Sequence, residues 1–323
     1  MASAAIPAAR QRPRSHLSIT QREAIEGYLY ILPWILGFII FVLGPLVASI
    51  YLSFTDYSIL KPPKFNGLTN YRRIFTEPLF WKSVANTLYY AAIFVPLNLF
   101  TSLGCALLLN QRFRGRAFFR TAYFLPSITP TVATVILWIW IFNPQVGLMN
   151  HLLSFIGISP GPGWLGSIRW SKPALIIMSL WASAGGANML IFLAGLQGVP
   201  RELHESADID GANSWQRFWG ITLPLLSPSM FFVLILGIIG ALQMFTLAYV
   251  ASTGYNVPAG GPATSTLFYM VNLYNNAFDY WEMGYGSALA WVFFLAVLLL
   301  TYTQLRLARS WVYYEAAGGD RKW

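Results

Sequence analysis

Six long runs without a charged residue constrain this chain more than any other feature of its sequence. They cover residues 28–54, 84–109, 121–142, 173–197, 225–250 and 285–305. A helix needs about 20 apolar residues to cross roughly 30 Å of hydrocarbon at 1.5 Å per residue. Each run reaches that length, so we predict an all-α membrane protein with six transmembrane helices.

The scarcity of charge supports a membrane protein. Only 10% of the residues are charged, against about 25% in an ordinary soluble domain, so lipid must form part of the solvent. A net charge of +9 alone would be compatible with nucleic acid binding, but Lys and Arg gather in short segments beside apolar runs, which is the pattern that orients membrane helices and disfavours nucleic acid as a partner. The single cysteine, Cys105, excludes an intrachain disulfide, and the three histidines lack metal-ligand spacing.

The positions of Lys and Arg predict the orientation of the spans. With the N-terminus inside, the inner segments hold 14 of these residues and the outer loops hold 7. The tight turn 111–120 holds four, which outweighs the five in the predicted outer loop 56–83 because charge in short loops orients helices most strongly. We therefore predict that both termini are cytoplasmic.

Both ends of the chain are interpreted as cytoplasmic tails, residues 1–27 and 306–323. The first tail is rich in Arg, Ala and Pro without apolar periodicity, so we expect it to be mobile. It resembles an organelle transit peptide in composition, but Glu23 and Glu26 directly before a full-length span favour a cytoplasmic tail.

Local signals predict some features of the loops and spans. Asn66-Gly67 predicts a turn, and Thr69 is a candidate cap for a short helix after it. Pro126 and Pro130 should kink the third span.

The polar segment 200–224, PRELHESADIDGANSWQRFWGITLP, lies between two apolar runs and must therefore lie in water, on the cytoplasmic side by the charge count. Pro200 suits the first position of a helix, and Glu202 falls in its first turn, near the positive end of the helix dipole. Gly211 provides a flexible position at its C-terminal end. We call this segment the polar hairpin.

A second short helix is predicted over residues 215–220, capped by Asn213 or Ser214. Trp215 and Trp219 give it an aromatic side that could sit at the membrane surface. Spacing alone is also compatible with an amphipathic hairpin lying on the membrane.

The polar hairpin resembles the EAA loop of permease subunits in binding-protein-dependent ABC importers. The family pattern is E-A-A, three residues, G, nine residues and I-x-L-P. This chain keeps that spacing, with a serine at the second position, and the resemblance implies an ATPase-coupling loop made by Glu205, Ser206, Ala207, Asp210, Gly211, Ala212, Ile221, Leu223 and Pro224. Serine is small enough to leave docking intact.

Other stretches resemble sugar permeases of the maltose and lactose type. These are YLYILPWILGFIIFVLGPLVASIYLSFTDY, GLTNYRRIF, and Asp210-Gly211-Ala212 with Pro200 upstream. The resemblance spans residues 28–309. It implies the type I ABC importer permease fold over residues 28–305, in a multi-pass protein of the prokaryotic inner or plasma membrane.

The resemblance also implies partners and a non-catalytic role. Two cytosolic ATPases would bind ATP and Mg²⁺ and hold such loops, a related second permease would complete the pore, and an extracellular or periplasmic binding protein would deliver a sugar. The chain itself would need no cofactor and no catalytic residue, since no G-x-x-x-x-G-K-[ST] motif occurs in it. A related polyol or glycerol-phosphate-type solute is the alternative cargo.

Polar residues inside spans are candidates for the solute pathway, because they are costly in lipid. Trp181 and Asn188 flank the loose Ala184-Gly185-Gly186 stretch, and Gln243 lies in the fifth span, where the resemblance places polar contacts to sugar. Each could instead serve helix-to-helix packing.

Two other function classes fit less well. A secondary carrier driven by protons or sodium would keep an ionisable residue in mid-span, and none of the six runs contains one. A membrane-embedded enzyme would need a catalytic cluster of acids, bases or metal ligands, and no such cluster is visible in the sequence.

Overall fold

The structure is a computed structural model that describes residues 18–255 and 257–313. Residues 1–17 and 314–323 of the two predicted tails lie outside the described part. The chain divides into two units, one ending at Tyr51 and one starting at Leu52, and each is described by itself.

The described part of the first unit is one apolar helical stretch made of α1 (Ile19–Phe38), the π-helical turn η1 (Ile39–Leu43) and α2 (Gly44–Ser53), whose last two residues already belong to the second unit. Ser18 and Gln21 form a capping box at its start, satisfying two backbone N–H groups that the helix leaves unpaired. The prediction of a mobile tail is therefore wrong for residues 18–27. The cap and the Arg22–Glu26 pair one turn later support helix there.

The second unit starts with a feature that the all-α prediction missed. Strands β1 (Thr55–Ser58) and β2 (Lys61–Phe65) form an antiparallel hairpin in which Thr55 lies opposite Phe65. Pro62 and Pro63 fit β2 because both edges of a two-stranded sheet leave N–H positions without a ladder partner. The predicted turn at Asn66-Gly67 follows, with Gly67 at a φ of +63°.

The short helix α3 (Thr69–Thr76) confirms a helix after this turn, but not its predicted cap. Thr69 is the first helical residue, and Leu68 occupies the cap position without a side-chain hydrogen bond. The Thr69 hydroxyl donates to the Asn66 carbonyl at 2.8 Å, so the side chain closes the turn instead of capping the helix.

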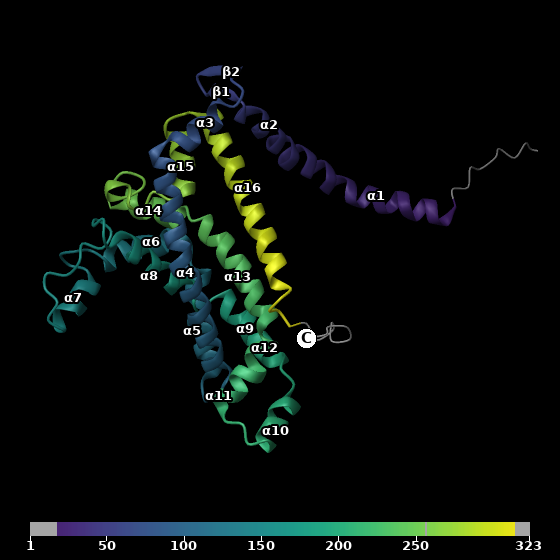
Figure 1. The fold of residues 1–323 in the computed structure, drawn as a ribbon, viewed down its shortest axis with the longest axis vertical. Helices are drawn as coiled ribbons and strands as arrows, with labels where there is room; N and C mark the ends of the chain where they lie inside the picture. Colours follow the sequence, from purple (N-terminus) through teal and green to yellow (C-terminus); the bar gives the residue numbers. More distant parts are fainter. Residues whose placement is uncertain (1–17, 256, 314–323) are drawn as a thin grey trace, which may run out of the picture. The chain divides into compact units, whose positions relative to one another are not determined.

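Helices account for most of the second unit. They are α4 (Pro78–Asn110), α5 (Arg116–Ile128), α6 (Thr131–Ile141), α7 (Leu148–Phe155), α8 (Ser171–Ser183), α9 (Ala187–Gly198), α10 (Arg201–Ile209), α11 (Ser214–Arg217), η2 (Phe218–Thr222), α12 (Leu223–Leu225), α13 (Ser227–Leu242), α14 (Thr246–Gly254), η3 (Pro262–Thr264), α15 (Tyr269–Tyr274), η4 (Asn275–Asp279) and α16 (Met283–Ala308). In Figure 1 the β-hairpin and α3 lie at the upper end of this unit, and α10 and α11 at the lower end.

Four helical stretches among the described residues are long and apolar enough to cross a membrane, and the number is six if each of two bent pairs counts as one span. The four are 20–53, 78–110, 227–254 and 283–308. Most helices extend beyond the predicted uncharged runs; α4 begins at Pro78, before Lys82. Charge marks where hydrocarbon ends, whereas the helix continues into the headgroup region, so the runs underestimate helix length.

The first bent pair confirms the kink predicted at Pro130 in the third run, whereas Pro126 lies inside α5. Helices α5 and α6 meet at 98°. Pro130 caps α6 at its start, and Thr129 before it has an extended ψ of 134°. A proline ring disfavours helical geometry in the preceding residue, which explains the break at this point.

The second bent pair, α8 and α9, meets at 48° at the Ala184-Gly185-Gly186 stretch. A side chain on Gly185 would lie 2.2 Å from the backbone oxygen of Tyr123, and one on Gly186 would lie 2.8 Å from the Ser127 Cβ. The two glycines therefore allow α5 to pack directly against this bend.

Two of the buried clusters hold together the helices around the candidate site. One joins α4, α6, α8, α14 and α15 around fully buried side chains such as Val135, Met178 and Phe268. The other joins α4, α9 and α13 through Ala106, Phe192 and Leu226. This second cluster lies beside the polar hairpin.

Candidate functional site

The first limb of the polar hairpin is helix α10, which ends in a left-handed corner. Pro200 takes the cap position, one residue before its predicted place inside the helix. Glu205 and Ser206 are exposed, and Ala207 is half-buried. Glu202 lies in the first turn, as predicted, where a carboxylate is favoured by the helix dipole.

Gly211 turns the chain at the end of α10. Its φ is +77°, a conformation that glycine adopts without the steric cost that other residues carry. The N–H of Asp210 donates to Ser206 at 3.0 Å, and the N–H of Ala212 donates to Ala207 at 2.9 Å. These bonds pair the last carbonyls of the helix. Residues 205–207 and 210–212 are thereby joined in one hydrogen-bonded turn, which we call the closed corner.

The second limb begins at Asn213, which confirms one of the two predicted caps. Asn213 and Gln216 form a reciprocal capping box, with bonds of 2.8 and 2.9 Å. The predicted helix over 215–220 is α11 followed by the π-helical turn η2, so it starts one residue earlier and continues to Thr222.

An ion pair that sequence reasoning missed joins the two limbs. Arg217 of α11 donates to the carboxylate of Asp208 of α10 and to the hydroxyl of Ser214. The two charges lie nine residues apart on either side of Gly211. This placement of opposite charges across a turn is the sequence signal that could have suggested the contact. The pair holds the limbs together as one unit.

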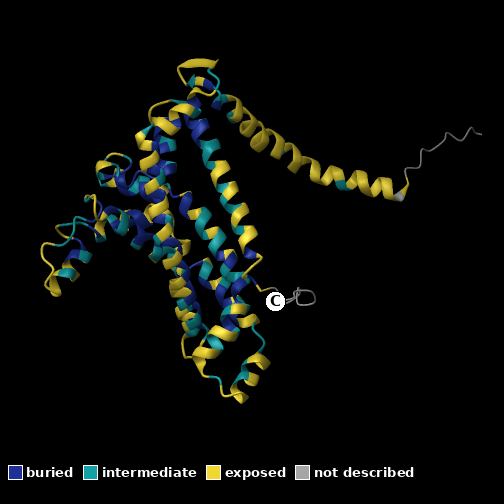
Figure 2. Ribbon diagram, viewed as in Figure 1, coloured by how far each residue is buried: buried dark blue, intermediate teal, exposed yellow. Residues whose placement is uncertain are grey.

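The hairpin is exposed at its tip and buried at its base, as Figure 2 shows in yellow and blue. Ile209 is 88% exposed, whereas Thr222 is buried and Leu226 is fully buried. Phe218 and Leu223 pack against the cluster of α4, α9 and α13. Movement of the tip would therefore reach the helix bundle through the second limb.

A hollow of about 280 Å³ lies at the bend between α5 and α6. Leu247 and the glycine bend line it together with polar side chains from α5, α6, α8, α9 and the α5–α6 break, which are Ser127, Thr129, Thr131, Thr134, Ser183 and Asn188. Hydroxyl and amide groups can hydrogen-bond to an uncharged polar solute.

The structure does not gather the three predicted pathway residues in one place. Asn188 lines this hollow, whereas Trp181 and Gln243 are not among its lining residues. Trp181 meets Trp138 edge-on, with ring centroids 6.0 Å apart. Gln243 is exposed at the break between α13 and α14, where Phe245 has a non-helical φ of −134°. Sequence reasoning named none of the serine and threonine residues around the hollow.

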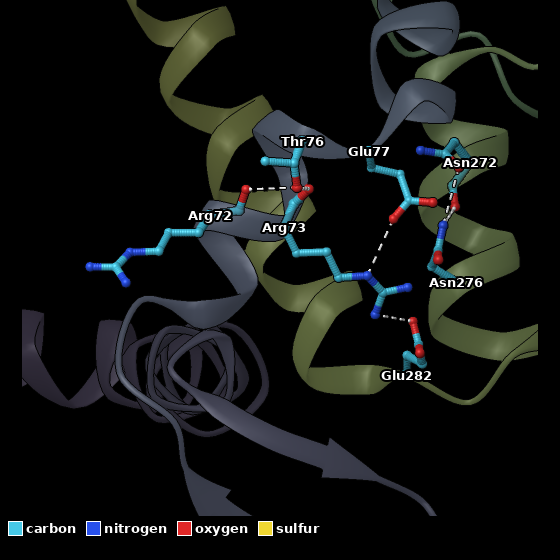
Figure 3. Close-up of polar contacts among 7 residues, drawn as sticks. All are labelled: Arg72, Arg73, Thr76, Glu77, Asn272, Asn276 and Glu282. Carbon is cyan, nitrogen blue, oxygen red and sulfur yellow. Dashed lines mark hydrogen bonds and ion pairs between the residues drawn. The ribbon is translucent and has the colours of Figure 1, made fainter.

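The opposite end of the second unit is tied by charged side chains (Figure 3). Arg73 of α3 contacts Glu77 at 3.3 Å and Glu282, just before α16, at 2.8 Å. Its guanidinium also lies 4.2 Å from the ring centre of Tyr285. Partial burial lowers the pKa of Arg73, but the hydrogen bond and charge of Glu282 and the hydrogen bond to Glu77 outweigh this effect and raise that pKa above its ordinary value.

Contacts between distant parts of the sequence reinforce this end. Lys82 donates to the Ala263 carbonyl at 2.7 Å, and Asn86 donates to the carbonyls of Thr264 and Leu267 at 3.0 Å each. Lys172 in turn donates to the Asn86 side chain at 2.9 Å. Helix α4 is thus attached to the loop before α15.

Within residues 18–255 and 257–313, no group of three or more His, Cys, Asp or Glu side chains is arranged to hold a metal ion. The polar hairpin and the hollow at the α5–α6 bend are two candidate functional features of this part of the chain.

The known proteins that this chain resembles are components of transport systems. The model of the family described as binding-protein-dependent transport system inner membrane component matches residues 98–311. The probable ABC transporter permease protein YesP of Bacillus subtilis is 41% identical over 92% of this chain and 94% of its own length. The trehalose/maltose transport system permease protein MalF of Thermococcus litoralis is 36% identical over 89% of this chain and 95% of its own.

A solved structure shares the fold. It is a chain from the crystal structure of a bacterial ABC transporter involved in the import of the acidic polysaccharide alginate. That chain matches with a TM-score of 0.75 and 22% sequence identity, over 90% of this chain and 96% of that one.

Proposed function

We propose, from the premise that this chain belongs to the inner-membrane components of binding-protein-dependent transport systems, that it forms half of a carbohydrate pore in an ATP-driven importer. The observation that carries the coupling role is the exposed corner of the polar hairpin. Glu205 and Ala207 lie on the short helix α10 and Gly211 turns the chain after it, while the second limb packs against the helix bundle.

Two cytosolic ATPases would supply the energy, each holding one such hairpin in a surface cleft. The small side chains of Ser206 and Ala207 let α10 approach a groove closely, and the exposed Glu205 carboxylate can accept charge-assisted hydrogen bonds from it. ATP and Mg²⁺ would be bound by those partners, and this chain would carry out no chemical step itself.

Force would travel from the hairpin into the helices along a short path. The Arg217–Asp208 pair makes the two limbs move together, and Phe218, Leu223 and Leu226 are packed against α4, α9 and α13. Closure of the ATPases would tilt these helices and switch the pore from inward-open to outward-open. A second, related permease would complete the pore.

We propose a topology of six spans, with both termini and the polar hairpin in the cytoplasm. The two bent pairs would each count as one span, and the Lys and Arg count supports this orientation. The end that carries α3 and the start of α16 would then face outward, towards the solute-binding protein.

A carbohydrate is the proposed cargo because the MalF relative is named for trehalose and maltose, and the fold neighbour for alginate import. The hollow at the α5–α6 bend has the hydroxyl and amide lining that sugar hydroxyls require, with Asn188 in it. Trp181 and Gln243 would contact the solute at other points of its passage. A polyol or a glycerol-phosphate-type solute is the alternative cargo.

Charge reversal tests the coupling role. We expect Glu205→Lys to lower ATP-dependent sugar uptake at least tenfold in reconstituted vesicles, since it replaces an acceptor of charge-assisted bonds with a repelling charge. Glu202→Lys, on the same helix but outside the motif, is the matched control and should keep most of the uptake. Membrane insertion should be normal in both variants. Equal losses in both would remove the specific role of Glu205.

Reconstitution tests the function class. The chain with its ATPase and binding-protein partners should accumulate sugar only when ATP is present, and the chain without the ATPase should accumulate none. A secondary carrier would accumulate solute in the absence of the ATPase. Labelling of a cysteine introduced at Glu205, with Cys105 replaced by alanine, should succeed only from the cytoplasmic side.

A further inference from the structure

A second hollow, with a volume of about 720 Å³, lies beside the base of the polar hairpin. It forms where the turn between α4 and α5 meets the junction of α9 and α10. Its polar lining consists of Asn110, Arg112, Arg116, Gln197, Arg201 and His204.

Positive charge is not balanced by any of the side chains that line this hollow. Its lining has three arginines and a histidine and no acidic side chain. None of the ion pairs among the described residues involves Arg112, Arg116 or Arg201. Like charges on facing elements repel one another, so an anion between them would stabilise this arrangement.

The backbone adds to the attraction for an anion. Arg116 and Arg201 are the first residues of α5 and α10, and neither helix has a side-chain cap. The unpaired N–H groups and the positive end of each dipole therefore lie next to arginine side chains that line the hollow. These helix ends support a site whose main determinants are the three guanidinium groups.

A neighbouring hollow of about 320 Å³ shares Asn110, Leu196, Val199 and His204 with the first. Apolar side chains, Leu107 and Phe218 among them, form part of its wall. A charged hollow next to a more apolar one suits a ligand with a charged group and an apolar remainder, although a small anion would fill the charged part alone.

We propose that this hollow binds a phosphate-bearing anion, either the headgroup of an anionic phospholipid or a soluble phosphate. Guanidinium groups match phosphate oxygens with paired hydrogen bonds, and three of them converge here with His204. The position between two segments that we place on the cytoplasmic side makes both sources accessible.

Bound anion would connect the α4–α5 turn to α10, and so hold the base of the polar hairpin against the bundle. This consequence rests on the proposed coupling role, but binding itself does not. We expect occupancy of the site to change ATP-driven uptake, because Arg201 and His204 belong to the same helix as Glu205.

Binding can be measured on the purified full-length chain. The probes are phosphatidylglycerol, with phosphatidylcholine as the uncharged comparison, followed by native mass spectrometry, and inorganic phosphate, followed by titration calorimetry. Removing one guanidinium should weaken binding about tenfold, as expected for a hydrogen bond to a charged group. We therefore expect Arg112→Gln/Arg116→Gln to weaken binding about a hundredfold.

Arg114→Gln is the matched control, because Arg114 lies in the same turn but does not line the hollow. It should bind like the unmodified chain, and thermal unfolding should be similar in all variants. Selective loss of phosphatidylglycerol identifies a lipid site, and selective loss of inorganic phosphate identifies a soluble ligand. Either result supports the proposal.

Equal binding by all variants, or no binding of either probe, would overturn it. If neither probe binds, failure of the double variant to co-purify with the other transporter subunits would give the arginines another role. The arginines would then be contacts for acidic side chains of a partner. Each of these results can be separated from a failure of the coupling role, which is measured by uptake in the Glu205 variant.

Discussion

The two ends of the second unit are stabilised in different ways. At the polar hairpin, the hydrogen bonds and the ion pair join residues at most nine positions apart. At the end with α3 and α16, Lys82 and Ala263 are 181 positions apart, and Tyr269 donates its N–H to Thr87 across 182 positions.

This difference indicates which end of the second unit can move as a rigid body. A segment whose hydrogen bonds are all local keeps its shape when it moves. The end with α3 and the start of α16, which we call the stapled end, is held by long-range hydrogen bonds and must break them to change its conformation. The hairpin is therefore suited to carry motion, and the stapled end to resist it. The following variants test that contrast, from the largest expected effect to the smallest.

The largest effect is expected at the corner of the hairpin. Gly211→Val places a β-branched residue at a φ of +77°, which costs roughly 1–2 kcal/mol or more and opens the closed corner. We expect uptake to fall more than tenfold in vesicles while the melting temperature of the bundle changes little. Gly220→Ala, in the same hairpin without a positive φ or a close neighbour, should transport normally. Unchanged transport by Gly211→Val would mean that the corner need not keep its shape.

A packing change at the stapled end should instead lower stability. A methyl group on Gly284 would lie 2.2 Å from the backbone oxygen of Thr55, so Gly284→Ala must displace the start of α16 from β1. We expect a loss of about 1–3 kcal/mol, measured as a lower unfolding temperature in detergent. Gly240→Ala, which meets no atom within 4 Å, is the control. Equal unfolding temperatures for the two variants would contradict the close packing.

The smallest effect is expected for the ion pairs of Arg73. The Arg73 and Glu282 side chains are each about 40% exposed, so solvent screens their pair, and we expect Arg73→Gln to cost about 1 kcal/mol or less. Unfolding in detergent at low and high salt measures it, and salt should narrow the gap to the unmodified chain. A cost above that of Gly284→Ala would make charge, not packing, the main support of this end.

Local chemistry explains which features could be predicted from the sequence. The glycine corner, the Asn213 cap and the break before Pro130 each depend on a few neighbouring residues, and the structure confirms all three. Family membership was predictable because the E-x-A and I-x-L-P residues keep a fixed spacing in the polar hairpin.

Features that depend on distant contacts were not predictable in the same way. The break at Gln243 occurs in ALQMFT, which contains neither proline nor glycine, and Phe245 there packs on Tyr274 with ring centroids 5.0 Å apart. The Asp208–Arg217 pair needed the corner geometry, and the hollow at the α5–α6 bend needed the packing of several helices. No single stretch of sequence contains that information.

The break at Thr129 has a consequence for hydration. Main-chain amides at an interrupted helix lose their partners, and hydrocarbon offers none in exchange. If α5 and α6 form one span, these groups persist at membrane depth only where water can reach them, and Thr129 and Thr131 line the adjoining hollow. The peptide backbone would thus keep water at this break whatever side chains surround it. Substitutions in the lining of the hollow would then change which solutes pass while the passage stays hydrated.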